Sequence, residues 1–123
     1  MARAFPPNEE QELIRRFFGD TPGFFVEVGA NDPHARSQTY HLEQKGWTGL
    51  LIEPQPDLAE ALRANRRARV FAVACSDPAH DGDTLTLHVA GPLSSLNRER
   101  MAPGTVPDGA IAVPVRTLDR VLA

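Results

Sequence analysis

The sequence predicts a single α/β domain built on a doubly wound, mostly parallel sheet. Its 123 residues suit one domain. Three short apolar runs, at 24–28, 48–53 and 69–75, alternate with two segments of helical pattern. Apolar runs without strict alternation are typical of strands that are covered on both faces, as in parallel sheets. Strands that alternate with helices indicate βαβ units, so we expect a βαβαβ core over residues 24–77.

Residues 1–20 predict a helix that precedes this core. Asn8 is a suitable N-cap with acidic residues in the turn that follows, and Gly19 ends the pattern. Two pairs of apolar residues spaced four apart give the helix one apolar face: Leu13 with Phe17, and Ile14 with Phe18.

The two helical segments between the strands have different signals. Residues 36–46 end at Gly46, whereas Gln55 and Pro56 open the second helix, because proline is well placed in a first turn. We expect an inward stripe on the second helix: Leu58, Ala61, Leu62 and Asn65. Four arginines near its end complement the helix dipole, and we interpret them as a solvated patch: Arg63, Arg66, Arg67 and Arg69.

The pattern changes after residue 77. Residues 84–90 alternate strictly between apolar and polar, which predicts a half-exposed, antiparallel strand. Residues 91–110 read as a loop, and 111–115 as a short strand whose Pro114 favours a sheet edge. Thr117 is a suitable cap for a last helix.

The composition argues against several classes of function. A net charge of −3 disfavours a nucleic-acid surface, which normally has a basic stripe. No apolar run is long enough to span a membrane, and the first residues lack a signal-peptide pattern. Cys75 is the one cysteine, so no internal disulfide framework exists and we expect a reducing, cytoplasmic location. The four histidines lack the spacing of a metal site.

Polar and small residues follow the predicted parallel strands, at the edge where open α/β sheets bind ligands. Glu27 and Gly29 end the first strand, and Glu53 ends the second, 24 residues after Gly29. An acid about 20 residues beyond a glycine turn is the acceptor that ribose hydroxyls need. Cys75 and Ser76 end the third strand, where an adenine ring would lie.

The first turn favours S-adenosylmethionine over NAD as the ligand. It has a single glycine, Gly29, rather than the G-x-G-x-x-G that cradles a pyrophosphate. The Glu27 carboxylate would repel a pyrophosphate, but it suits the ammonium group of S-adenosylmethionine, which has no phosphate. Both acids also have structural interpretations: Glu27 as a carboxylate bound to loop amides, and Glu53 as a helix-start charge.

Five stretches resemble the FkbM family of S-adenosylmethionine-dependent methyltransferases: FVEVGAND, SQTYHLEQKGWTGLLIEPQPDLAEALRANR, VACSD, SSLN and VPVRTLDRVL. Their order and spacing are similar over residues 20–122. The resemblance implies a Rossmann-like class I methyltransferase sheet and, most often, O-methylation of a hydroxyl on a sugar or other small metabolite. It implies cofactor contacts as follows: Glu27, Gly29 and Asn31 in the first loop, Ser37 near the methionine end, Glu53 at the ribose, and Ser76 with its neighbours by the adenine.

The chain departs from this resemblance in two places. Many members have a glycine soon after the asparagine, where this chain has Asp32 followed by Pro33 and His34. The family also usually continues past TLDRVL into a Lys-x-Asp-x-Glu-Gly strand. We therefore expect a fragment or a half-domain, with the sheet truncated after its first half and an antiparallel strand added. The strand at 24–28 would then have an unpaired apolar edge, covered by a second copy or by the N-terminal helix.

Three hypotheses remain open at this point. The chain is the cofactor-binding part of a methyltransferase, a non-catalytic S-adenosylmethionine- or nucleotide-binding module that works by association, or an NAD-linked Rossmann enzyme. His34 could act as a general base, although an exposed loop histidine is the simpler interpretation. Methyl transfer mainly needs positioning, so the lack of a catalytic triad does not argue against catalysis.

Overall fold

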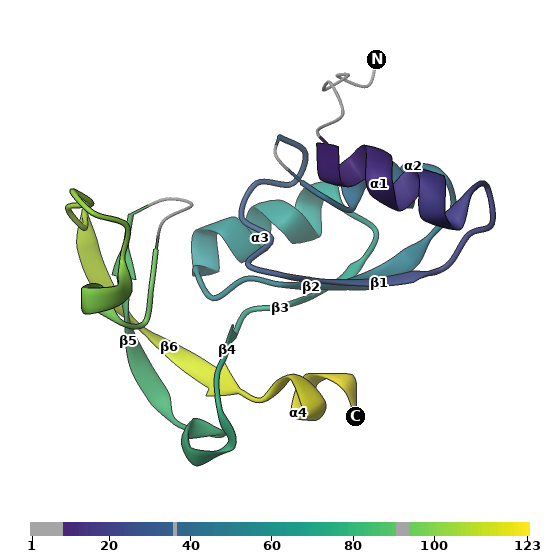
Figure 1. The fold of residues 1–123 in the computed structure, drawn as a ribbon. Helices are drawn as coiled ribbons and strands as arrows, with labels where there is room; N and C mark the ends of the chain where they lie inside the picture. The colour runs from purple at the N-terminus through teal and green to yellow at the C-terminus, as the bar shows by residue number, and fades with distance from the viewer. Residues whose placement is uncertain (1–8, 36, 91–93) are drawn as a thin grey trace.

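The computed structural model describes residues 9–35, 37–90 and 94–123, whose strands form two sheets (Figure 1). The first sheet is parallel, with the order β1-β2-β3. Its strands are β1 (Phe24–Val28), β2 (Thr48–Ile52) and β3 (Arg69–Phe71). The second sheet has the order β4-β6-β5. Its strands are β4 (Ala74–Cys75), β5 (Thr84–Val89) and β6 (Gly109–Arg116). The fold is therefore mixed α/β around a three-stranded parallel sheet.

Three helices lie on one side of the parallel sheet in Figure 1: α1 (Glu9–Phe18), α2 (Tyr40–Gln44) and α3 (Pro56–Asn65). The last helix, α4 (Leu118–Leu122), follows β6. Short 3₁₀ turns lie at Pro78–His80 and Arg98–Arg100. In the described part of the chain, no helix is long and apolar enough to cross a membrane.

Each sheet has its own apolar core. The core between the parallel sheet and its helices contains these residues: Phe25, Ala30, Leu42, Trp47, Leu51 and Leu62. The core of the second sheet is smaller: Ala74, Leu87, Val113 and Val115. In the first core, a Cβ on Gly49 would lie 2.4 Å from the backbone oxygen of Phe25, so β1 and β2 require glycine there.

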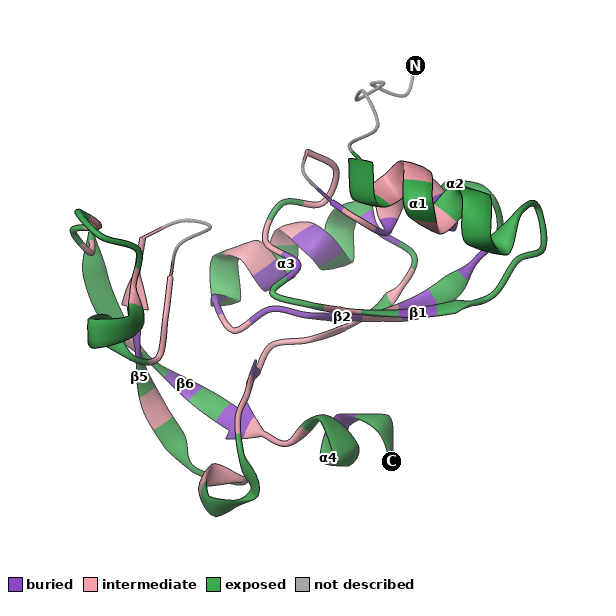
Figure 2. Ribbon diagram, in the orientation of Figure 1, coloured by how far each residue is buried: buried purple, intermediate pink, exposed green. Residues whose placement is uncertain are grey.

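The expectation that both faces of the first strand are covered is wrong. Phe25 is buried, but Phe24, Val26 and Val28 on the other face are 58%, 37% and 54% exposed. Figure 2 shows this change from buried to exposed positions along β1. The physical reason is that α1, α2 and α3 pack on the same side of the sheet, which leaves the apolar residues of the opposite face in solvent.

β1 pairs with β2 along one edge, and its other edge has no strand partner among the described residues. The helix α1 packs against the first core through Ile14, and the Phe18 ring lies 5.2 Å from that of Trp47. Leu13 and Phe17 of the predicted apolar face are exposed. The predicted cap Asn8 lies outside the described residues. Pairing of the β1 edge with a second copy stays a prediction.

Two predicted elements have different bounds in the structure. The strand predicted at 69–75 is interrupted, because β3 pairs with β2 whereas β4 turns away to pair with β6. The helix predicted at 36–46 begins only at Tyr40. The Ser37 hydroxyl oxygen accepts hydrogen bonds from the amides of Thr39 and Tyr40, at 3.3 and 3.0 Å, and this turn replaces the first part of the predicted helix.

The inward stripe predicted for α3 is correct at Leu62, which is fully buried, but Asn65 is exposed and Ala59 is buried instead. The interpretation of the arginines after it as a solvated patch is wrong for Arg66, which is 6% exposed. A buried carboxylate, Glu43, lies against its guanidinium and compensates the buried charge.

β5 and β6 are antiparallel, as predicted for residues 84–90, with a register that runs from Thr84 opposite Pro114 to Val89 opposite Gly109. The prediction that Pro114 marks a sheet edge is wrong, because β6 is the central strand. The amide of Val115 donates to the backbone carbonyl of Asp83, on the β5 side of β6. Because successive backbone amides point to opposite sides of a strand, the Pro114 nitrogen faces β4, which pairs only with Val115 and Arg116. The proline therefore removes no ladder hydrogen bond.

The predicted N-cap of the last helix is confirmed. The Thr117 hydroxyl oxygen accepts a hydrogen bond from the Arg120 amide at 3.1 Å. The Thr117 amide donates to the Asp81 carboxylate, which also binds the Arg120 guanidinium. These contacts hold α4 against the turn between β4 and β5.

Candidate functional site

Two cavities meet at Gly29, beside the carboxyl ends of β1 and β2. The first, which we call the acidic cavity, has a volume of about 400 Å³. It is lined by residues of β1 and the loop after it: Glu27, Val28, Gly29, Ala30, Asn31, Asp32, Ala35 and Gln38. The second, the apolar cavity, has about 310 Å³. Its lining comes from several elements: Val28, Gly29, Ile52, Pro54, Val73, Ala74, Cys75, Leu87, Ser94, Ser95 and Leu96.

The turn after β1 contains Gly29, which has no side chain between its backbone and the two cavities. Gly29 has a φ of 76° and Asn31 a φ of 55°, both in the left-handed region that glycine and asparagine tolerate best. The amides of Gly29 and Ala30 donate to the Ile52 carbonyl at 2.8 and 3.1 Å, which fixes the turn to the end of β2. No atom lies within 4 Å of the position that a Cβ on Gly29 would take, so the space in front of the turn is open.

Glu53 fastens this turn to the start of α3. One carboxylate oxygen accepts from the Asn31 amide and the other from the Gln55 amide, both at 2.9 Å. Glu53 is 2% exposed, and burial raises the pKa of its carboxyl group, while the two amides oppose the shift. The carboxylate thus lies between the two cavities and holds both loops, rather than standing free in either cavity.

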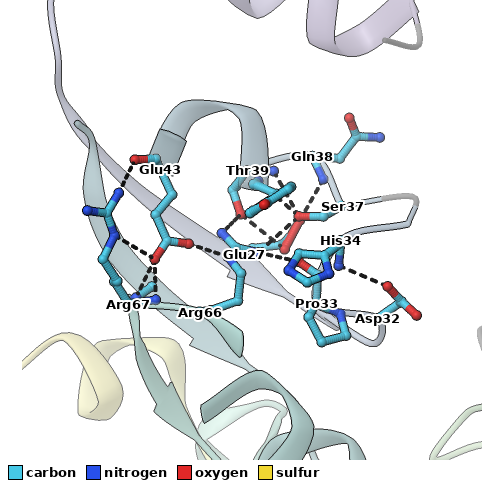
Figure 3. Close-up of polar contacts among 12 residues, drawn as sticks. Glu27, Asp32, Pro33, His34, Ser37, Gln38, Thr39, Glu43, Arg66 and Arg67 are labelled. Atoms are coloured by element: carbon cyan, nitrogen blue, oxygen red, sulfur yellow. Dashed lines mark hydrogen bonds and ion pairs between the residues drawn. The ribbon is translucent and has the colours of Figure 1, made fainter. Parts of the chain in front are cut away.

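Glu27 is half-buried, whereas Glu53 is buried, and Glu27 lines the acidic cavity. Figure 3 shows its polar contacts. Its two oxygens accept from the Gln38 amide at 2.9 Å and from the Thr39 hydroxyl at 3.2 Å. Burial raises the pKa of the Glu27 carboxyl group, whereas the Gln38 amide and the positive charge of Arg66 lower it. Glu27 therefore binds the loop after β1, as its structural interpretation predicts, and faces the cavity as well.

A buried ion pair supports the loop behind Glu27. The side chains of Arg66 and Glu43 are 0% and 5% exposed, and the Arg66 Nε donates to the Glu43 carboxylate. The Arg66 Nη1 donates to the Pro33 carbonyl and to the Ser37 hydroxyl, each at 3.1 Å, and its Nη2 donates to the Thr39 hydroxyl at 3.1 Å. One side chain thus connects the end of α3, helix α2 and the loop that forms the acidic cavity.

Comparison with known proteins decides the family. The sequence profile of the Methyltransferase FkbM domain matches residues 27–123, which is most of the chain. This chain belongs to the FkbM methyltransferase family. No curated protein and no solved structure shows a significant match. The match supports assignment as a methyltransferase, and it includes both strand-end carboxylates and the loop between Gly29 and Thr39.

The FkbM domain brings together part of the predicted site. Glu27, Gly29 and Asn31 share the acidic cavity, and Cys75 lines the apolar cavity. Burial raises the pKa of the Cys75 thiol, which agrees with a packing role rather than a nucleophilic one. Whether these residues bind a cofactor stays a prediction.

Three predicted residues of the FkbM domain lie outside both cavity linings: Ser37, Glu53 and Ser76. Ser37 is 2% exposed and uses its hydroxyl for Arg66 and for the turn before α2. The Ser76 amide donates to the Arg116 carbonyl at 3.2 Å, which continues the pairing of β4 with β6. These hydrogen bonds indicate a structural role for both serines.

The sequence provided no signal for two features of this site. The first is Arg66, whose local context predicted a surface residue. The second is the contact of Gln55 with Ser94, in which the side-chain amide donates to the hydroxyl at 3.3 Å. The Ser94 hydroxyl also accepts from the Ala90 amide at 2.8 Å. The segment SSLN contributes Ser94, Ser95 and Leu96 to the lining of the apolar cavity.

Proposed function

We propose that this FkbM domain binds S-adenosylmethionine across the two cavities at Gly29 and transfers its methyl group to a hydroxyl on a sugar or other small metabolite. The observation that carries the proposal is the contrast between the two cavities. One has two carboxylates in its lining, Glu27 and Asp32, whereas the described lining of the other has none, and the two cavities adjoin. We further infer that β1, β2 and β3 are part of a Rossmann-like class I methyltransferase sheet.

The acidic cavity fits the ammonium and sulfonium charges of S-adenosylmethionine. Glu27 and Asp32 contribute carboxylates to it, and its described lining contains no lysine or arginine. An ammonium group is attracted to such a site, whereas a pyrophosphate is repelled. The open space in front of Gly29 also fits, because a ligand can approach the backbone where a Cβ would otherwise project.

The apolar cavity fits the adenine ring. Aliphatic side chains contribute to its lining, among them Val28, Leu87 and Leu96. Ser94 and Ser95 add hydroxyls to this lining, and a few polar groups within a mainly apolar lining are typical of small-molecule sites. Glu53 lies between the cavities, where the ribose would pass. Because Glu53 is 2% exposed, sugar binding at this carboxylate requires the Asn31 turn to shift.

When bound, S-adenosylmethionine supplies a methyl group already activated by its sulfonium charge. The protein then needs to align the acceptor oxygen with that methyl group and to exclude water. Such positioning can lower a barrier by roughly 7–11 kcal/mol. Glu27 would orient the ammonium end, and the apolar cavity would hold the adenine.

A second candidate function is a module that binds S-adenosylmethionine and works by association with a partner. The exposed apolar face of β1, formed by Phe24, Val26 and Val28, favours it, because such faces mark contact surfaces. Measuring methyl transfer to sugar hydroxyls by the chain alone separates the two functions: turnover supports the first, and cofactor binding without turnover supports the second.

Calorimetry with S-adenosylmethionine, S-adenosylhomocysteine and NAD tests the cofactor. We expect the two adenosyl ligands to bind and NAD not to bind. Glu27→Gln removes the charge that binds the ammonium group and should weaken binding at least ten-fold. Glu60→Gln, on the exposed side of α3, is the matched control and should bind like the wild type. Binding of NAD alone, or no adenosyl binding by a folded chain, would refute the proposal.

A double-mutant cycle tests the ribose contact of Glu53 separately from its structural part. In the wild type, the 2′-deoxy analogue of S-adenosylhomocysteine should bind about ten-fold more weakly than the parent ligand. In Glu53→Gln this penalty should shrink, because the acceptor of the hydroxyl is already altered. An equal penalty in both proteins would show that Glu53 only holds the loops.

A further inference from the structure

Arg66 is buried although it follows directly after the end of α3. Its guanidinium has five N–H donors, and they are directed at three kinds of acceptor: a carboxylate, a backbone carbonyl and two hydroxyls. Its carbon Cζ also lies 5.4 Å from the centre of the Tyr40 ring. A side chain bound on all sides holds one conformation, so it can fix the positions of the groups that it contacts.

The Thr39 hydroxyl joins this guanidinium to the acidic cavity (Figure 3). Its oxygen accepts from the Arg66 Nη2 at 3.1 Å, and its hydrogen is donated to the Glu27 carboxylate at 3.2 Å. A hydroxyl has a single hydrogen. The hydrogen bond from Arg66 therefore directs that hydrogen towards Glu27. It favours the ionised form of Glu27, because a carboxylate accepts hydrogen bonds and has no hydrogen to donate.

We propose that Arg66 is a positioning residue of the cofactor site, which acts through Thr39 to hold the Glu27 carboxylate as an anion facing the acidic cavity. The inference rests on the proposed function for its ligand, because the ammonium group of S-adenosylmethionine is what the anion would bind. The link between Arg66 and Glu27 itself is a property of the protein without ligand.

Opposing effects act on the Glu27 carboxyl group, and their net result is a raised pKa. Burial disfavours its anion, and the positive charge of Arg66 opposes that effect. Asp32 lines the same cavity and adds a second negative charge. Glu43 faces Arg66 from α2, and Tyr40 contributes a neutral ring beside it. Arg66 is the cation of the described residues whose charge acts on Glu27, so its removal shifts the balance towards the protonated acid.

Carbon-13 NMR titration of the ligand-free chain tests the link directly. We expect Arg66→Gln and Thr39→Val to raise the pKa of Glu27, with the larger increase in Arg66→Gln. Arg63→Gln is the matched control, because Arg63 is exposed and pairs with Glu60. Thr39→Val retains the ion pair of Arg66 with Glu43, so it keeps the test decisive if Arg66→Gln does not fold. An unchanged Glu27 pKa in Thr39→Val and in any folded Arg66→Gln overturns the inference.

The pH profile of S-adenosylhomocysteine binding tests the consequence. In Thr39→Val we expect affinity to fall at least ten-fold near neutral pH and to recover as the pH rises and Glu27 ionises. A loss of the same size at every pH would show that the residue is merely structural, and it would overturn the inference. If the Glu27 pKa shifts as expected but no protein binds the ligand, the proposed function fails and the link between Arg66 and Glu27 stands.

Discussion

Both sheets have an apolar core, but they differ in the polar groups that are buried beside it. Around the parallel sheet, a buried ion pair and two strand-end carboxylates bind loops through hydrogen bonds. In the second sheet, the core contains only aliphatic side chains, with Leu87, Val113 and Val115 at its centre. The acidic cavity is lined by β1 and the loop after it, whereas the apolar cavity has lining residues from both regions. The difference indicates that the polar contacts shape the acidic cavity, whereas the second sheet contributes side chains to the apolar cavity.

The polar contacts around the parallel sheet join distant parts of the chain. Arg66 and Glu43 are 23 residues apart, and Asn31 and Glu53 are 22 residues apart. The pairs of β5 with β6, such as Thr84 with Pro114 and Val89 with Gly109, are just as distant in sequence, but the alternation of apolar and polar residues along β5 predicts that strand. Four predictions test this comparison, in order of decreasing effect.

Removal of one member of the buried ion pair should have the largest effect. Glu43→Gln leaves the Arg66 charge buried without its partner, which costs about 3–5 kcal/mol of the free energy of unfolding. Urea denaturation measures it. Glu60→Gln removes an exposed pair with Arg63 and should change stability by less than about 1 kcal/mol. Equal effects of the two substitutions would remove the distinction between the buried and the surface pair.

The second region should respond to loss of volume rather than loss of charge. Leu87→Ala in β5 is expected to cost about 2–5 kcal/mol of unfolding free energy, because Leu87 is 3% exposed in the apolar core. Thr86→Ala, the exposed neighbour on the same strand, is the control. If the two variants had the same urea midpoint, the hairpin core would not be a source of stability.

The cap of α4 should make a smaller contribution. Thr117→Ala removes the hydroxyl that accepts from the Arg120 amide, and we expect a loss of about 1 kcal/mol. Thermal unfolding measures the change. Thr117→Ser retains the hydroxyl and should be close to the wild type, so similar losses in both variants would show that the methyl group, and not the cap, is important.

The pH dependence of stability should show the cost of burying Glu27. Its pKa in the folded chain is raised above the ordinary 4.5, so the folded state binds more protons than the unfolded state above that pH. The contribution of Glu27 to stability is therefore fully present below about pH 4.5 and is lost as the pH rises through the folded pKa. Glu27→Gln should show a weaker decline in urea experiments from pH 4 to 7, and an identical decline would contradict the raised pKa.

Local signals in the sequence determined much of the fold. Apolar runs located β1 and β2, Pro56 located the start of α3, and strict alternation predicted the antiparallel strand β5. The carboxylates at the strand ends were evident too, because Glu27 and Glu53 directly adjoin these runs. These features depend on residues that are close in sequence, where propensity and periodicity act.

Only the tertiary structure decided the rest. The burial of Arg66, the open face of β1 and the interruption between β3 and β4 all depend on which elements pack together. Pro114 lies in a central strand because its neighbour β4 is only two residues long, which the sequence around the proline does not reveal. The physical reason is the same in each case. Burial and charge pairing depend on residues that are distant in sequence, and a local sequence pattern does not show which distant residues will be neighbours.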